Sequence, residues 1–235
     1  MKFVFLVFNA ILVGAACLLT LMCYQSIQIP VKFKEDVAKR DAVVIQRLKD
    51  IRTLQELHRD LHQNYCASWE QLIKFAKTDS VSICVKKGTL TDQQLADGLN
   101  EKKAWMYLCN PKKYAKEISK FNLDINTFSR DTVKVNVLEN DSSMMSRNVL
   151  KWIDTIQYVP FAAHDTFELN IGSVTTASGY NMSLFEAKVP YEVYLKGLNE
   201  AELNNKIAER KEMDKFPGLQ VGDATQANNN AGNWE

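Results

Sequence analysis

The sequence predicts an α+β protein: an N-terminal transmembrane helix, a long amphipathic helix, then a mixed domain with an antiparallel sheet of about four strands and several helices. Three observations support this fold class. An uncharged apolar run opens the chain, apolar residues then recur at helical spacing, and short alternating stretches follow. We divide the chain into an anchor (1–30), a long amphipathic helix (31–66), an α+β domain (67–215) and an Asn-rich tail (216–235).

The apolar run, FVFLVFNAILVGAACLLTLMCY, extends from Phe3 to Tyr24 and contains no charged residue. As a helix it would be about 33 Å long, which matches a bilayer hydrocarbon core of roughly 30 Å. Its GAAC stretch has the small residues of a cleavage site, but cutting there would leave a strongly apolar N-terminus. We therefore favour an uncleaved anchor, with cleaved and lipidated forms as the alternatives.

The orientation of the anchor rests on its place in the chain. A very short N-terminus, one span and a C-terminal body are typical of a signal anchor whose body is exported. Against this, four basic residues follow the span and only Lys2 precedes it, a count that slightly favours a cytoplasmic body. We expect a single-pass protein of the inner (cytoplasmic) membrane with a periplasmic body, and sidedness stays open.

The long helix is expected over residues 33–65. Pro30 precedes it and predicts a kink or a short break. One face carries apolar residues near heptad spacing, with His58 among them. We name this face the apolar stripe: Val37, Val44, Leu48, Ile51, Leu54, Leu61 and Tyr65. It suits either packing along the body or a coiled-coil stem that contacts neighbouring proteins, and we favour packing along the body.

The remaining elements follow from capping residues and alternation. Ser68, Thr91 or Asp92, Asn110 and Asn199 are candidate N-caps. The expected helices are 68–77, 92–99, 111–120, 141–152 and most of 191–213. The expected strands are 81–85, 132–138, 155–160, 166–174 and 182–189, the last three as an antiparallel meander. The tail, 216–235, shows no periodicity, so we expect it to be disordered with Trp234 exposed.

Composition excludes some functions. The net charge is +1 and no basic stripe occurs, so we expect no nucleic-acid partner. The body holds three cysteines, Cys66, Cys84 and Cys109, which allow at most one disulfide in a monomer and leave its pairing open. The alternative is that these cysteines are small buried hydrophobic residues.

Candidate chemistry is sparse. His58, His62 and Cys66 follow one another at four-residue spacing, but the outer two would lie about 12 Å apart along a helix. Only one neighbouring pair, such as His58 and His62, could chelate a metal ion, and Arg59 stands where a zincin has its general-base Glu. No nucleophile elbow, phosphate loop or dinucleotide fingerprint occurs. We expect no metal site, no cofactor and no enzymatic activity.

The stretch RLKDIRTLQELHRDLHQNYCASWEQLIKF resembles the helix end of the type IV pilin and type II secretion pseudopilin family. The apolar helix, Pro30, the amphipathic continuation and the following sheet are similar to that family over roughly residues 3–75. The prepilin-peptidase site is missing, because Gly14 is followed by Ala15 and the fifth position of the mature chain would be Leu19 rather than Glu. The C-terminal segments PGLQVG and NNNAGNWE resemble uncharacterised Gram-negative envelope proteins.

Together these features lead us to expect a non-enzymatic envelope protein that serves as a structural or interaction subunit of a membrane assembly related to secretion. Its expected partners are the lipid bilayer and other envelope proteins, including further copies of itself. The alternative is a membrane-tethered lipoprotein or ligand-binding module. A third reading is an enzyme acting on envelope polymers.

Overall fold

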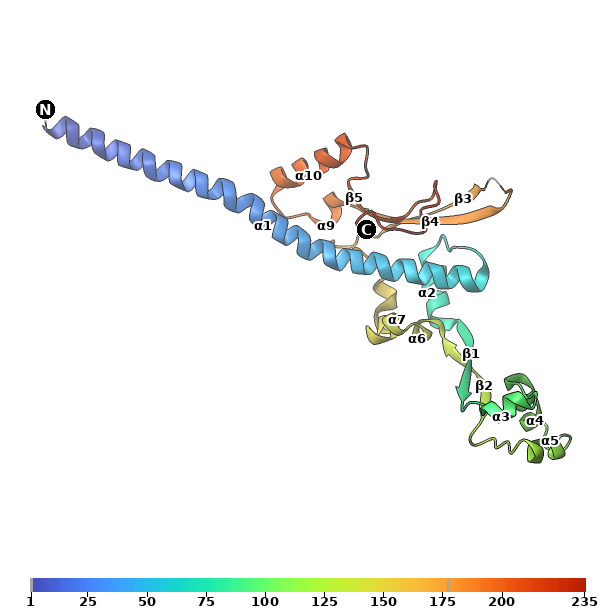
Figure 1. Ribbon diagram of the computed structural model, residues 1–235. Helices are drawn as coiled ribbons and strands as arrows, with labels where there is room; N and C mark the ends of the chain where they lie inside the picture. Colours follow the sequence, from blue (N-terminus) through green and yellow to red (C-terminus); the bar gives the residue numbers. More distant parts are fainter. Residues whose placement is uncertain (1, 177) are drawn as a thin grey trace. The chain divides into compact units, whose positions relative to one another are not determined.

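The computed structural model describes residues 2–176 and 178–235, with side chains from residue 12 onward (Figure 1). The chain divides into two compact units. The first comprises the segment up to Phe75 together with Asn148–Glu235, and the second is Ala76–Arg147. The segment 67–215, expected to be one domain, contributes to both units.

Helix α1 (Lys2–His62) dominates the first unit as a single element of 61 residues (Figure 1). Pro30 lies inside it, and the break expected there does not occur. Proline removes one backbone hydrogen bond from a helix, and the turns on either side of Pro30 are long enough to absorb that loss. The chain therefore leaves the apolar run and enters the body without changing its secondary structure.

The first part of α1 is fully exposed. Every residue from 12 to 29 is exposed, and these include large apolar side chains such as Leu19 and Met22. Among the described residues, one helix is long and apolar enough to cross a membrane, and none of its most apolar window is buried in the protein. This helix is a candidate membrane span.

The second part of α1 forms the core of the first unit. Val44, Leu48, Ile51 and Leu54 are completely buried, and the helix packs on strands β4 (Asn181–Pro190) and β5 (Gly218–Gly222). Val37 and Tyr65 are buried too, whereas Leu61 is 40% exposed. The prediction that this helix packs along the body is confirmed.

The sheet of the first unit is antiparallel, with the order β3–β4–β5, and β3 covers Glu168–Thr175. The hairpin expected between the last two predicted strands is present, with Ile171 opposite Phe185. The prediction of a strand at residues 155–160, the first of the expected meander, is wrong. Residues 155–160 form no strand; the 3₁₀ turn η1 (Ile153–Thr155) and an isolated bridge from Tyr158 stand there.

The third strand of the sheet is instead β5, which pairs with β4 at the edge opposite β3, and its glycines explain how. Gly222 has a φ of +70°, and a Cβ built on it would lie 2.2 Å from the Phe185 carbonyl oxygen. A Cβ on Gly218 would meet the Val189 carbonyl oxygen at the same distance. Because glycine has no side chain, the two backbones can approach this closely.

Short helices complete the first unit. Asn199 caps α10 as predicted, since its side chain accepts a hydrogen bond from the Glu202 amide. The expected helix 141–152 is interrupted by Asn148, which adopts a left-handed conformation with φ 49°. The bounds are α2 (Trp69–Thr78), which runs on past Phe75, α8 (Val149–Trp152), α9 (Tyr191–Tyr194) and α10 (Glu200–Glu212).

The second unit is a two-stranded ribbon with a small helical cluster. Strand β1 (Ser80–Lys87) pairs antiparallel with β2 (Ser129–Asn136), so the expected single sheet of about four strands is two separate sheets. A small core holds the helical cluster: Leu99, Ala104, Leu108, Leu123 and Phe128. The helices are α3 (Asp92–Ala96), α4 (Glu101–Cys109), α5 (Ala115–Lys120), α6 (Val137–Asn140) and α7 (Ser142–Ser146).

Candidate functional site

The C-terminal tail folds back onto the first unit, so the prediction that it is disordered is wrong. Beyond β5 it forms an isolated bridge between Val221 and Gly232, and the Asn233 amide donates to the Gln220 carbonyl at 3.0 Å. These bonds join residues that are ten or more positions apart. No short-range periodicity in an Asn-rich segment could have indicated them.

The end of the tail is bonded to α1. Arg52 Nη1 lies 2.8 Å from Glu235 Oε1 and 3.2 Å from the Asn230 carbonyl oxygen. The hydrogen bond from Arg52 holds the pKa of the Glu235 carboxyl below its ordinary value. Glu235 is therefore attached to the C-terminal part of α1, which ends at His62.

Trp234 is half-buried, in contrast to the exposed end we expected. Its ring covers Gly232 so closely that a Cβ there would lie 2.4 Å from two ring atoms. Its indole nitrogen is buried and has no hydrogen-bond partner among the residues that the structure describes. The tryptophan ring thus packs on the backbone of the tail itself.

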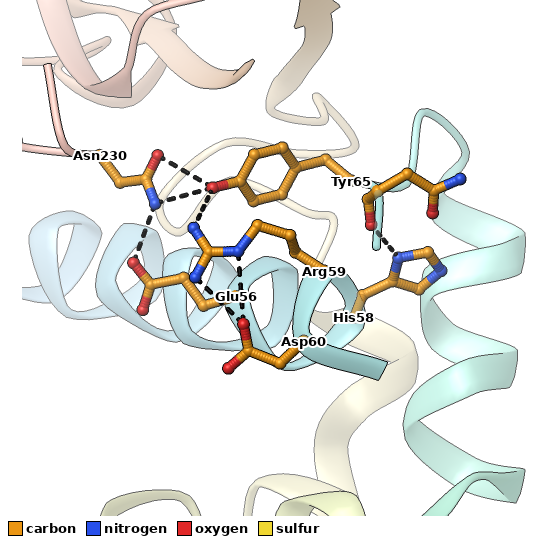
Figure 2. A network of polar contacts seen from close by, with 7 residues as sticks. Glu56, His58, Arg59, Asp60, Tyr65 and Asn230 are labelled. Atoms are coloured by element: carbon orange, nitrogen blue, oxygen red, sulfur yellow. Dashed lines mark hydrogen bonds and ion pairs between the residues drawn. The ribbon is translucent and has the colours of Figure 1, made fainter. Parts of the chain in front are cut away.

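Five side chains form what we call the tail–helix network: Glu56, Arg59, Asp60, Tyr65 and Asn230 (Figure 2). Asn230 Nδ2 donates to Glu56 Oε1 at 3.0 Å and to the Tyr65 hydroxyl oxygen at 3.1 Å. Arg59 Nη1 donates to the same hydroxyl oxygen at 2.8 Å. Because Tyr65 and Asn230 are both buried, the bond between them is shielded from water, whereas the bonds with Glu56 and Arg59 are partly buried.

A cavity of about 510 Å³ lies beside this network, and we call it the tail cavity. Three segments of the first unit line it: the end of α1 with the turn after it, the start of β4, and the tail from Ala227 to Asn230. Its position depends on the folded tail. A disordered tail, as the sequence predicted, would leave no such cavity.

Three residues that line the tail cavity have left-handed backbones without being glycine. Gln63 has a φ of 63°, and Asn229 and Asn230 each have a φ of 56°. Gln63 ends α1, and its amide donates to the Arg59 carbonyl at 2.7 Å, an arrangement in which glycine is the usual residue. Asparagine tolerates this conformation better than glutamine does. The chain thus retains a long polar side chain where glycine would be less strained.

The histidine pair has a packing role. The His58 and His62 rings have centroids 4.7 Å apart, and both meet Phe75 edge-on. His58 Nδ1 donates to the Asn64 carbonyl at 2.7 Å (Figure 2), which uses one of its two nitrogens. No group of three or more possible metal ligands occurs in the part of the chain that the structure describes.

A second polar cluster joins α1 to α9. The Tyr194 hydroxyl donates to Asp41 Oδ1 at 2.6 Å, and Arg40 Nη1 donates to the carbonyls of Tyr194 and Lys196. Burial raises the pKa of the Asp41 carboxyl, and burial together with Asp41 raises the pKa of the Tyr194 hydroxyl. Local sequence patterns could not indicate this pair, because its members are 153 positions apart.

All five cysteines are free. Cys66 is buried, and its backbone exchanges two hydrogen bonds with the side chain of Gln55 at 2.8 and 2.9 Å. Cys84 and Cys109 are exposed in the second unit. The interpretation as a small buried residue therefore holds for Cys66 alone of the three.

No family model, no curated protein and no solved structure matches this chain. What the site does has to be inferred from its own residues. Sequence reasoning found Tyr65 but missed Glu56, Asn230 and Glu235. No sequence signal indicated the helix end at Gln63, because the apolar stripe continues past it to Tyr65.

Proposed function

We propose that this is a single-span envelope protein whose exported body serves as a structural or interaction subunit of a membrane assembly, pseudopilin-like and related to secretion. The observation that supports this proposal most is the continuity of α1. Its residues 12–29 are exposed, and its second part is the core of the body.

Energetics favour a lipid environment for the first part of α1. Burying one Leu, Val or Met side chain is worth about 1.5–3 kcal/mol, and residues 12–29 leave many such side chains without cover. A bilayer removes this cost, and the helix satisfies its own backbone hydrogen bonds. In this proposal the unbroken helix would then hold the body at a fixed height above the membrane.

The arrangement of the first unit is consistent with the pilin-like part of the proposal. A three-stranded antiparallel sheet packs on the second part of a helix whose first part is apolar and exposed. The apolar stripe is used within the body, apart from Leu61. Contacts with other subunits would therefore use the exposed part of α1 and the outer surface of the body.

No catalytic step is part of this proposal. The tail–helix network attaches the tail to α1, and the pair of Asp41 and Tyr194 attaches α9 to α1. Both clusters are thus assigned to holding the fold.

Export is tested with the exposed thiols of Cys84 and Cys109. In intact spheroplasts, a membrane-impermeant maleimide should label both, whereas buried Cys66 should react only after unfolding. Replacing Cys17 and Cys23 by serine beforehand removes signal from the span. Labelling of Cys84 and Cys109 only after lysis would place the body in the cytoplasm.

The subunit role is tested by crosslinking in native membranes, followed by purification in mild detergent. The proposal predicts defined adducts with other envelope proteins or with further copies of the chain. A strictly monomeric protein without adducts would contradict the subunit role, whatever the outcome for export.

A further inference from the structure

The tail cavity is the right size for a small ligand. Ligand pockets commonly measure about 300–1,000 Å³, and this cavity of about 510 Å³ falls within that range. Most such pockets are mainly apolar, whereas polar side chains predominate around this one. A ligand that fits it must therefore make many hydrogen bonds.

The charges at the cavity cancel. Arg59 and Asp60 are the two charged side chains among the described residues that line it. They pair with each other, with Arg59 Nη2 3.1 Å from Asp60 Oδ1. An anionic or cationic ligand would find no surplus of opposite charge, so the lining favours a neutral ligand.

Two kinds of uncharged group in the lining, amides and an aromatic ring, suit a sugar. Gln63, Asn181 and Asn229 supply amides, each of which can donate and accept hydrogen bonds. Tyr180 supplies an aromatic ring that is 68% exposed. Sugars carry hydroxyls, which also donate and accept, and their rings have an apolar C–H face that can lie against the electron-rich face of an aromatic ring.

From this combination we propose that the tail cavity binds a neutral oligosaccharide, with Tyr180 as the stacking platform and the amides of Gln63 and Asn229 bonded to sugar hydroxyls. The proposal goes beyond the subunit role and needs neither the anchor nor an assembly partner.

Two features prepare the cavity for a ligand. The tail–helix network fixes Tyr65 and Asn230 in the wall through bonds of 2.8–3.1 Å (Figure 2). The left-handed backbones of Gln63 and Asn229 place those residues at the cavity with a strain that often accompanies binding sites. A wall that is ordered before binding loses less entropy when the ligand arrives.

The test uses the full chain in a detergent without a sugar headgroup, because a glycoside detergent would compete for the site. An array of neutral oligosaccharides built from glucose, galactose, mannose and N-acetylglucosamine is screened beside sialylated and sulfated counterparts. Each hit is then measured by isothermal titration calorimetry. We expect at least one neutral oligosaccharide to bind with a dissociation constant between about 1 μM and 1 mM.

Variants locate the binding. Tyr180→Ala and Gln63→Ala should each weaken it by about tenfold or more, whereas Tyr180→Phe keeps the ring and should change it by less than about threefold. Tyr158→Ala is the matched control, since Tyr158 is 41% exposed and lies outside the cavity lining. Near-ultraviolet circular dichroism checks that each variant is folded.

Three results would overturn the proposal. One is a folded protein that binds no neutral oligosaccharide of the array. Another is binding confined to the sialylated or sulfated members, which would assign the cavity to an anion. The last is neutral-sugar binding that neither Tyr180→Ala nor Gln63→Ala weakens, which would place it elsewhere on the surface.

Discussion

Arg52, ten residues before the end of α1, donates a hydrogen bond to the side chain of Glu235 at 2.8 Å. The same guanidinium nitrogen reaches the Asn230 carbonyl oxygen, so one side chain holds two points of the tail. Both partners are partly exposed, so solvent screens this ion pair and its contribution to stability is small. The hydrogen bonds of Arg52 with Glu235 and Asn230, and that of the Asn230 side chain with Glu56, attach the tail to α1.

Glu235→Gln should lower the free energy of unfolding by about 0.2–1 kcal/mol at neutral pH, as expected for an exposed ion pair. The pKa of Glu235 is depressed in the folded protein. The ion pair therefore gives its full stabilisation above the ordinary pKa of a glutamate. This stabilisation is lost as the pH falls through the pKa that Glu235 has in the folded protein. Urea unfolding of the full chain across this pH range measures both effects. Exposed Glu209→Gln is the control, and an equal loss from both variants would contradict the ion pair's role.

Asn230→Ala should lower the free energy of unfolding by about 1–3 kcal/mol, because it leaves the partly buried Glu56 carboxylate without its amide donor. The change should also loosen the tail, which hydrogen exchange of the backbone amides from Ala227 to Glu235 would detect. Asn229→Ala is the matched control, since Asn229 has the same φ of 56° but is exposed and outside the network, and it should lower the free energy of unfolding by at least about 1 kcal/mol less than Asn230→Ala does. Equal stability of the two variants would show that the network does not hold the tail.

The free energy of unfolding should depend on pH through Asp41 in the opposite direction to its dependence through Glu235. Burial raises the pKa of its carboxyl in the folded protein, so the folded state keeps this proton to a higher pH than the unfolded state does. Stability should therefore fall as the pH rises from the ordinary aspartate pKa through the folded value. Asp41→Asn should remove this slope while still accepting the hydrogen bond from Tyr194. Unfolding curves of both proteins measured across that range provide the test; an unchanged slope in the variant would contradict it.

Gly222→Ala should destabilise the first unit more than Gly179→Ala does. Both glycines have positive φ, +70° and +78°, so an alanine meets the same backbone strain at either position. A Cβ on Gly222 would collide with the Phe185 carbonyl, whereas nothing lies within 4 Å of one on Gly179. We expect Gly222→Ala to lower the free energy of unfolding by about 1–3 kcal/mol more than the control Gly179→Ala does, as measured by thermal unfolding. Equal costs would mean that β5 does not pair closely with β4.

Local patterns predicted much of the fold. The heptad spacing predicted that Val44 and Leu48 would be buried, and both are completely so. Asn199 caps its helix as expected, and Thr91 forms a capping box with Gln94. These features depend on residues within a few positions of one another, which is what periodicity and capping rules describe.

The tail and its cavity could not be predicted in this way. Asn230 contacts Glu56 across 174 positions, and β5 is a five-residue strand with glycine at both ends. Neither a long-range hydrogen bond nor so short a strand leaves a periodic signal in the sequence. Helix α4, by contrast, is predictable from the sequence, because Asn100 is a residue type typical of an N-cap and its side chain accepts from the Lys103 amide.

The most direct test of the central claim, that α1 is both membrane anchor and core helix, is a cysteine scan along α1 in native membranes. With Cys17, Cys23, Cys84 and Cys109 replaced by serine, Leu18→Cys and Lys39→Cys are treated with a membrane-impermeant maleimide. Both side chains are exposed in the protein itself, so a difference between them reports the bilayer. We predict that Lys39→Cys reacts in intact membranes and that Leu18→Cys reacts only after detergent is added. Rapid labelling of Leu18→Cys in intact membranes would contradict the account.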